Sequence, residues 1–169
     1  MSAATSESKL SVTLPSDREI VLTRDFDAPR SLVFEAWTTP EHVMQWWAGC
    51  DGNTLTACEI DLRVGGAWRF VVRGPDGRAY AVKGVYREVV PPERVVHTQV
   101  LDVGAHSWSE ALVSVVFEDL GGGTRITQTI LHPTKEARDE HLRSGIETGA
   151  AASLARLEEI VQSLSQPAS

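Results

Sequence analysis

The chain has 169 residues, a length that suits one domain with a sizeable core. Its formal net charge is −7, its pI is about 5.2, and its basic residues are scattered singly along the sequence. An acidic protein gains nothing electrostatically from nucleic acid or an anionic membrane, so we expect neither as a partner.

The first 15 residues, MSAATSESKLSVTLP, are polar and lack the apolar core of a secretory signal. No run in the chain is apolar for long enough to span a bilayer. We therefore expect a cytoplasmic protein with a flexible lead-in over residues 1–15, a single domain over 16–165 and a tail over 166–169. Cys50 and Cys58 are spaced C-x7-C, which fits neither a redox pair nor a common zinc pattern, so we expect reduced thiols, no metal and no cofactor.

A strand followed by two short helices is expected near the N-terminus. Arg18–Phe26 is strand-like, and Pro29 follows it at a position just before a helix, where a missing N–H costs little. A first helix is therefore expected over Arg30–Trp37. Thr39-Pro40-Glu41 repeats the start signal, with a hydroxyl cap, a proline and an acid in the first turn. The second helix contains Val43, Met44, Trp46 and Trp47.

Beyond this helical pair the hydrophobic pattern alternates with a period of two, which predicts strands. The turn Gly74-Pro75-Asp76-Gly77 is a strong hairpin signal, because proline presets one turn position and glycine supplies a positive φ at another. Turns this short join antiparallel strands, so with the first strand we expect a curved antiparallel sheet of about seven strands. The six later strands are expected over Thr54–Asp61, Ala67–Arg73, Tyr80–Val89, Arg94–Leu101, Trp108–Glu118 and Thr124–Leu131.

A single long helix is expected from Thr134 to about Leu164, where it covers the apolar face of the sheet. Thr134 is a plausible cap, and Glu136 places an acid in the first turn. The fold class is therefore α+β. The apolar residues at helical spacing are Leu142, Ile146, Leu154, Leu157, Val161 and Leu164.

Six segments carry a resemblance to a known family. They read FDAPRSLVFEAWTTPEHVMQWW, EIDLRVGGAWRF, GPDGRAY, GVYREVVPPERVV, GGGTRITQTI and SGIETGAAASLARLEEIV. Together they resemble the bacterial single-domain proteins related to the activator of heat-shock protein 90 ATPase, within the SRPBCC or START superfamily. The resemblance implies a helix-grip fold, like that of the birch pollen allergen, with a cavity between sheet and long helix that often holds hydrophobic small molecules. It implies no fixed chemistry, because the superfamily includes carriers, cyclases, hormone receptors and co-chaperone domains.

One departure from the family pattern bears on the cavity. The family's last helix commonly carries Gly-Trp where this chain has Gly149-Ala150, and the next three residues are again small. Losing a large aromatic from a buried face leaves open volume. Gly145 and Gly149, four apart, place a smooth strip on the same helix. We therefore hypothesise a ligand-accessible cavity beside Ala150. In the alternative, the space is filled by Trp37, Trp46, Trp68 or Trp108.

Strand alternation places a neutral amide on the inner face of the sheet. Ile126 and Ile130 point inward with Gln128 between them. A buried amide needs a hydrogen-bond partner, so Gln128 is either a ligand anchor or bonded to Thr98, Ser153 or a buried water.

The residues expected to line the cavity come from both short helices, the sheet and the last helix. The two tyrosines among them could present hydroxyls to its interior. The full set is Trp37, Met44, Trp47, Trp68, Phe70, Tyr80, Tyr86, Val113, Val115, Phe117, Ile126, Gln128, Ile146, Gly149, Ala150 and Ser153.

Catalysis has little support in the sequence. His97, His106, His132 and His141 show no metal or triad spacing with an acid, and His132 and His141 are nine residues apart. Solvated surface positions are expected for the carboxylates Glu35, Glu59, Asp61 and Glu110. We assign no catalytic residue.

Three functions remain open at this level. Binding of a small hydrophobic molecule is preferred, and it predicts a cavity of about 300 Å³ or more. A co-chaperone-like role with a heat-shock protein 90 ATPase as partner predicts a solid interior and an exposed apolar patch. A polyketide-cyclase-like enzyme predicts titratable groups with shifted pKa values inside the cavity, for which Gln128, the tyrosines and His97 are weak candidates.

Overall fold

A computed structural model describes residues 10–47, 53–103, 106–107 and 109–165. Nine strands and four helices occur in these residues. In chain order they are β1 (Ser11–Thr13), β2 (Glu19–Phe26), α1 (Arg30–Thr38), α2 (Pro40–Trp46), β3 (Thr54–Ile60), β4 (Ala67–Arg73), β5 (Ala79–Val90), β6 (Arg94–Val103), β7 (His106–Ser107), β8 (Ala111–Asp119), β9 (Thr124–Leu131), α3 (Lys135–Arg143) and α4 (Ile146–Ser165).

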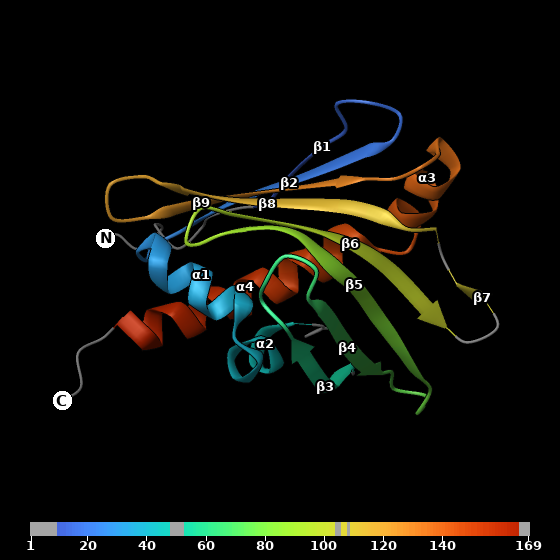
Figure 1. Cartoon of the computed structure of the whole chain (residues 1–169), viewed down its shortest axis with the longest axis horizontal. Coiled ribbons are helices and arrows are strands. Elements are labelled where there is room, and N and C mark those ends of the chain that lie inside the picture. The colour runs from blue at the N-terminus through green and yellow to red at the C-terminus, as the bar shows by residue number, and fades with distance from the viewer. Residues whose placement is uncertain (1–9, 48–52, 104–105, 108, 166–169) are drawn as a thin grey trace.

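The strands form one antiparallel sheet in the order β1-β2-β9-β8-β6-β5-β4-β3, and β7 pairs with β6. Figure 1 shows this sheet curving around α4, with α1 and α2 packed beside that helix. The expected α+β fold with a curved antiparallel sheet is confirmed. The strand count exceeds the expected seven by β1 and β7, which are three and two residues long. β1 lies within the expected flexible lead-in, so that expectation is wrong for residues 11–13.

Side-chain burial follows the predicted alternation. In β4, Trp68, Phe70 and Val72 are buried while Arg69 and Arg73 are exposed. The hairpin between β4 and β5 closes as expected: Gly74 N–H donates to the Arg78 carbonyl over 2.9 Å. Gly77 takes a φ of +85° in this turn, as the sequence predicts.

The expected single helix over Thr134–Leu164 is wrong, because it breaks between α3 and α4. Gly145 has a φ of +91° there, a left-handed conformation that ends a helix. Thr134 does cap α3, since its hydroxyl accepts the Ala137 N–H over 3.0 Å. Gly145 lies outside α4, so the expected strip of two glycines on one helix is also wrong. Gly149 alone of the pair lies on α4.

Thr39 does not act as the expected hydroxyl cap. It lies at the N-cap of α2, yet its side chain accepts no capping hydrogen bond. Thr39 also ends α1, with its backbone N–H donating to the Glu35 carbonyl over 3.0 Å.

Replacing Gly145 with alanine is expected to cost about 1 to 2 kcal/mol of unfolding free energy, because an L residue is disfavoured in the left-handed region. A Cβ at this position meets no atom within 4 Å, so the cost is conformational alone. Urea unfolding of Gly145→Ala measures it. The control Gly145→Asn should lose less, because asparagine tolerates this conformation. Equal stability of Gly145→Ala and the wild type would contradict the explanation.

A network of polar groups holds α4 to β2. The Glu158 carboxylate accepts hydrogen bonds from Arg24 Nη1 at 3.1 Å, from Asp27 N–H at 3.3 Å and from Gln162 Nε2 at 2.8 Å. Arg24 is buried and also lies over the Phe26 ring. On the same helix, Leu157 and Val161 pack into the core at 0% exposure. Polar and apolar contacts together fix α4 against the sheet.

Candidate ligand-binding cavity

A cavity of about 300 Å³, which we call the outer chamber, lies between the sheet and α4. Small residues of α4 form one wall, and inward-facing residues of β2, β5, β6 and β9 form the opposite wall. Its lining residues are Leu22, Trp37, Trp46, Trp47, Asn53, Tyr80, Gln99, Gln128, Ile130, His141, Ser144, Gly145, Ile146, Gly149, Ala150, Ser153 and Leu154.

A smaller space of about 50 Å³, the inner chamber, adjoins the outer one. The two chambers share Trp37, Trp46, Trp47, Gln99 and Gln128, which places them side by side. The other residues of the inner chamber are Val43, Trp68, Phe70, Tyr86, Val95 and His97.

Ring contacts fix the tryptophans as walls of the cavity. Trp46 Nε1 donates to the Ala36 carbonyl over 3.0 Å, and the Trp37 and Trp46 ring centroids are 4.9 Å apart. The Trp47 ring meets Phe70 edge to face at 5.0 Å. These side chains cannot rotate freely to close the space, because each is held by a neighbour.

Two glutamines bring amides to the boundary between the chambers. Within the described residues, neither the Gln99 nor the Gln128 side chain forms a hydrogen bond with another protein group. Of the two protein partners expected for Gln128, the Thr98 hydroxyl instead accepts the Val85 N–H over 2.9 Å, and Ser153 lines the outer chamber together with Gln128. Both amides are therefore available to a molecule in the cavity.

His97 and Tyr86 carry the polar groups of the inner chamber. Burial lowers the pKa of His97 to about 4, so the ring is neutral near pH 7. Its Nδ1 lies 3.0 Å from the Thr98 carbonyl oxygen. Burial, with a smaller contribution from Cys58, raises the pKa of Tyr86, which keeps its hydroxyl protonated.

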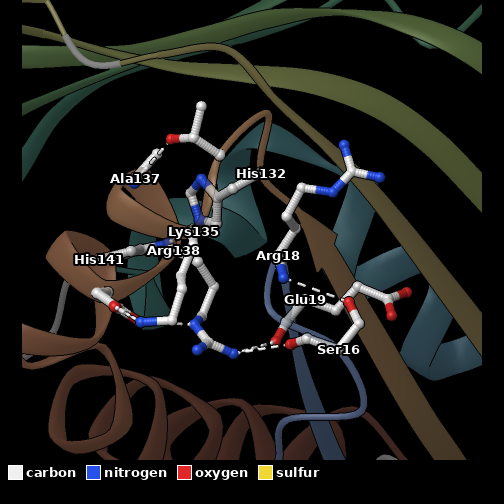
Figure 2. Close-up of polar contacts among 10 residues, drawn as sticks. Ser16, Arg18, Glu19, His132, Lys135, Ala137, Arg138 and His141 are labelled. Atoms are coloured by element: carbon white, nitrogen blue, oxygen red, sulfur yellow. Dashed lines mark hydrogen bonds and ion pairs between the residues drawn. The ribbon is translucent and has the colours of Figure 1, made fainter.

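At the other end of the outer chamber, His141 of α3 contacts His132, which follows β9 (Figure 2). His141 Nδ1 lies 2.9 Å from His132 Nε2. Burial, with a smaller contribution from His132, lowers the pKa of His141 to about 4. The pKa of His132 is also lowered, mainly by burial and to a lesser extent by Arg138. Arg138 anchors α3 to the segment before β2, donating from Nη1 to the Ser16 carbonyl over 2.8 Å. Both imidazoles are therefore neutral at neutral pH.

Eleven of the 16 expected lining residues contact the cavity. Eight line the outer chamber: Trp37, Trp47, Tyr80, Gln128, Ile146, Gly149, Ala150 and Ser153. Trp68, Phe70 and Tyr86 line the inner chamber.

The remaining five lie elsewhere. Met44 is 44% exposed, because α2 turns Val43 and Trp46 inward instead. Val113, Val115, Phe117 and Ile126 are buried in solid core and line neither chamber. The sheet is covered by α1 at this point: the Phe117 ring lies 5.1 Å from Phe34 and 5.9 Å from Trp37.

The sequence reasoning missed several lining residues. Gln99 could have been found, because it shares the inward parity of Val95 and His97 on β6. On β9 and β2, strand alternation likewise places Ile130 and Leu22 on the inward face. No sequence pattern indicated that His141 lines the cavity, since its position depends on how α3 turns back against β9.

None of the four carboxylates considered from the sequence reaches the cavity. Glu35, Glu59, Asp61 and Glu110 are all exposed, and none lines either chamber. Among the described residues, no group of three or more His, Cys, Asp or Glu side chains is placed to hold a metal ion. Within the same part of the chain, no helix has the length and apolar character needed to cross a membrane.

A curved antiparallel sheet gripping a C-terminal helix, with a cavity between them, defines a helix-grip protein. The sequence model described as "Activator of Hsp90 ATPase homolog 1-like protein" matches residues 27–162, and the chain belongs to this family. No curated protein matches the chain in sequence.

Solved structures share the fold. A protein from Rhodobacter sphaeroides is similar, with 27% identity and a TM-score of 0.83 over 92% of this chain and 99% of that one. A protein from Mycobacterium smegmatis shares the fold, with 22% identity and a TM-score of 0.80 over 95% and 99% of the two chains. The AHSA1-like protein from Aeromonas hydrophila also shares it, with 22% identity and a TM-score of 0.64 over 85% and 93%.

Proposed function

We propose that the protein binds a small hydrophobic molecule in the cavity between its sheet and α4. The outer chamber, at about 300 Å³, has the size of a small-ligand site. Its walls combine tryptophans and aliphatic side chains with a few neutral polar groups, the mixture that small-molecule sites commonly show.

The observation that carries this proposal is the run of small residues on the inner face of α4. Gly149, Ala150 and Ser153 all line the outer chamber. A tryptophan at position 150, as the family resemblance implies for related chains, would occupy this volume. In this chain the volume is open to a ligand.

Titration with the neutral fluorescent probe N-phenyl-1-naphthylamine tests the proposal. The wild type should bind the probe and enhance its emission. Ala150→Trp should weaken binding by more than about tenfold, because the indole fills the space that the probe needs. Circular dichroism verifies that the variant is folded.

Ala151→Trp is the matched control, because Ala151 is exposed and adjacent on the same helix. It should leave the affinity for the probe unchanged. Absence of binding to the wild type, or equal binding by Ala150→Trp and the wild type, would overturn the proposal.

Two alternatives rank lower. A co-chaperone-like role, acting on a heat-shock protein 90 ATPase, needs an outer contact surface and gives no account of an open interior. A polyketide-cyclase-like reaction needs a proton donor or acceptor at the substrate. Among the described residues the lining has no carboxylate, and pKa values of about 4 make His97 and His141 weak bases near pH 7. Ligand binding accounts for the cavity without further assumptions.

A further inference from the structure

Two polar groups on largely buried residues line the inner chamber without a partner in the described part of the protein. Tyr86 is 6% exposed and His97 is 9% exposed. Among the described residues, no hydrogen bond reaches the Tyr86 hydroxyl or His97 Nε2. A polar ligand group that enters the chamber can hydrogen-bond to them in place of water, whereas an apolar group would leave them without a partner.

The hydrogen-bonding character of His97 follows from its contact with Thr98. A carbonyl oxygen only accepts, so His97 Nδ1 carries the proton and donates to the Thr98 carbonyl over 3.0 Å. In a neutral ring Nε2 is then an acceptor. The Tyr86 hydroxyl can donate as well as accept, so the chamber offers both kinds of partner.

The described residues that line the two chambers carry no formal charge. Within that part of the chain, neither chamber is lined by an Asp, Glu, Lys or Arg residue. His97 and His141 are neutral near pH 7, because burial lowers the pKa of each to about 4. An ionised ligand would therefore lose its hydration without meeting a counter-charge.

We propose that the ligand is a neutral molecule with an apolar body and one neutral hydroxyl, carbonyl or amide group. The body lies in the outer chamber against the tryptophans, and the polar group enters the inner chamber to hydrogen-bond with Tyr86 and His97. The inner chamber, about 50 Å³, fits a group of this size, since a water molecule occupies about 30 Å³. The inference rests on the proposed function, whose cavity it uses.

Three probes of matched shape test it by displacing N-phenyl-1-naphthylamine at pH 7: 2-naphthol, naphthalene and 2-naphthoate. We expect 2-naphthol to bind about tenfold more tightly than naphthalene, because it adds a hydrogen bond to groups that are otherwise unpaired. The anion 2-naphthoate should bind at least about tenfold more weakly than 2-naphthol.

Tyr86→Phe removes the hydroxyl and keeps the ring. It should reduce the preference for 2-naphthol over naphthalene to within about threefold, while naphthalene affinity, which reports an intact cavity, stays unchanged. Gln128 lines both chambers, so its amide can also bond to a polar group that enters the inner one. As a second variant, Gln128→Leu should therefore weaken 2-naphthol selectively, and its matched control is Gln45→Leu, at an exposed position on α2.

The outcomes separate this inference from the function on which it rests. Loss of probe binding to the wild type overturns both. If the probe binds but naphthalene and 2-naphthol displace it equally, or 2-naphthoate does so best, the ligand class is wrong and the cavity function stands. Unchanged selectivity in both Tyr86→Phe and Gln128→Leu also overturns the inference.

Discussion

Glu158→Ala is expected to lower the unfolding free energy by about 3 to 5 kcal/mol, since it removes one partner from a buried ion pair. Arg24 is 7% exposed and Glu158 is 16% exposed, so the guanidinium would remain buried without its ion-pair partner. Two further donors, the Asp27 N–H and Gln162 Nε2, would lose their acceptor as well.

Urea unfolding followed by tryptophan fluorescence measures this loss. The matched control is Asp25→Ala, which removes the partner of Arg125 one residue along the same strand. That pair is 41% and 44% exposed, so its loss should cost no more than about 1 kcal/mol. If the two variants are equally stable, the Glu158 network does not hold α4 to the sheet.

The second large effect is a loss of stability in mild acid. His97 has a pKa of about 4 in the folded protein, against 6.5 when unperturbed, because burial disfavours its charged form. Between these values the unfolded chain binds more protons than the folded one, so stability falls as the pH drops from about 6.5 to about 4. His97 alone contributes about 3 kcal/mol to this loss.

His132 and His141 act in the same direction, because burial lowers the pKa of each. Asp25 and Asp139 have pKa values below 3.8 and lose their contribution only at lower pH, so the range from pH 7 to pH 4.5 reports mainly on the histidines.

As the pH is lowered from 7 to 4.5, the unfolding free energy of the wild type should fall steeply. His97→Gln, which stays neutral throughout, should give a shallower slope. A wild-type stability that does not change between pH 7 and pH 4.5 would show that the histidines are not buried as neutral rings.

The sequence predicted local structure well where a pattern repeats. Alternation located the strands, and the Gly74–Gly77 turn fixed the hairpin between β4 and β5. The sequence pattern did not predict the helix break at Gly145. Apolar residues at helical spacing continue from Leu142 to Ile146, and that spacing gives no information about the φ angle of the glycine between them.

The cavity was harder to predict than the strands. Alternation shows which face of a strand is inward, but the positions of the covering helices decide whether that face meets packed side chains or open space. Val113 and His97 are paired across β8 and β6, yet Val113 is in solid core and His97 lines the inner chamber. The difference depends on how the covering elements pack over each position, which is a property of the tertiary fold.

A crystal structure of the protein soaked with 2-naphthol tests the central claim most directly. We expect density for the ring system between α4 and the sheet beside Ala150, with the hydroxyl within hydrogen-bond distance of Tyr86 or His97. A chamber closed by inward movement of Trp37 or Trp47, with no ligand density beside Ala150, would contradict the claim that this protein is built around a ligand site.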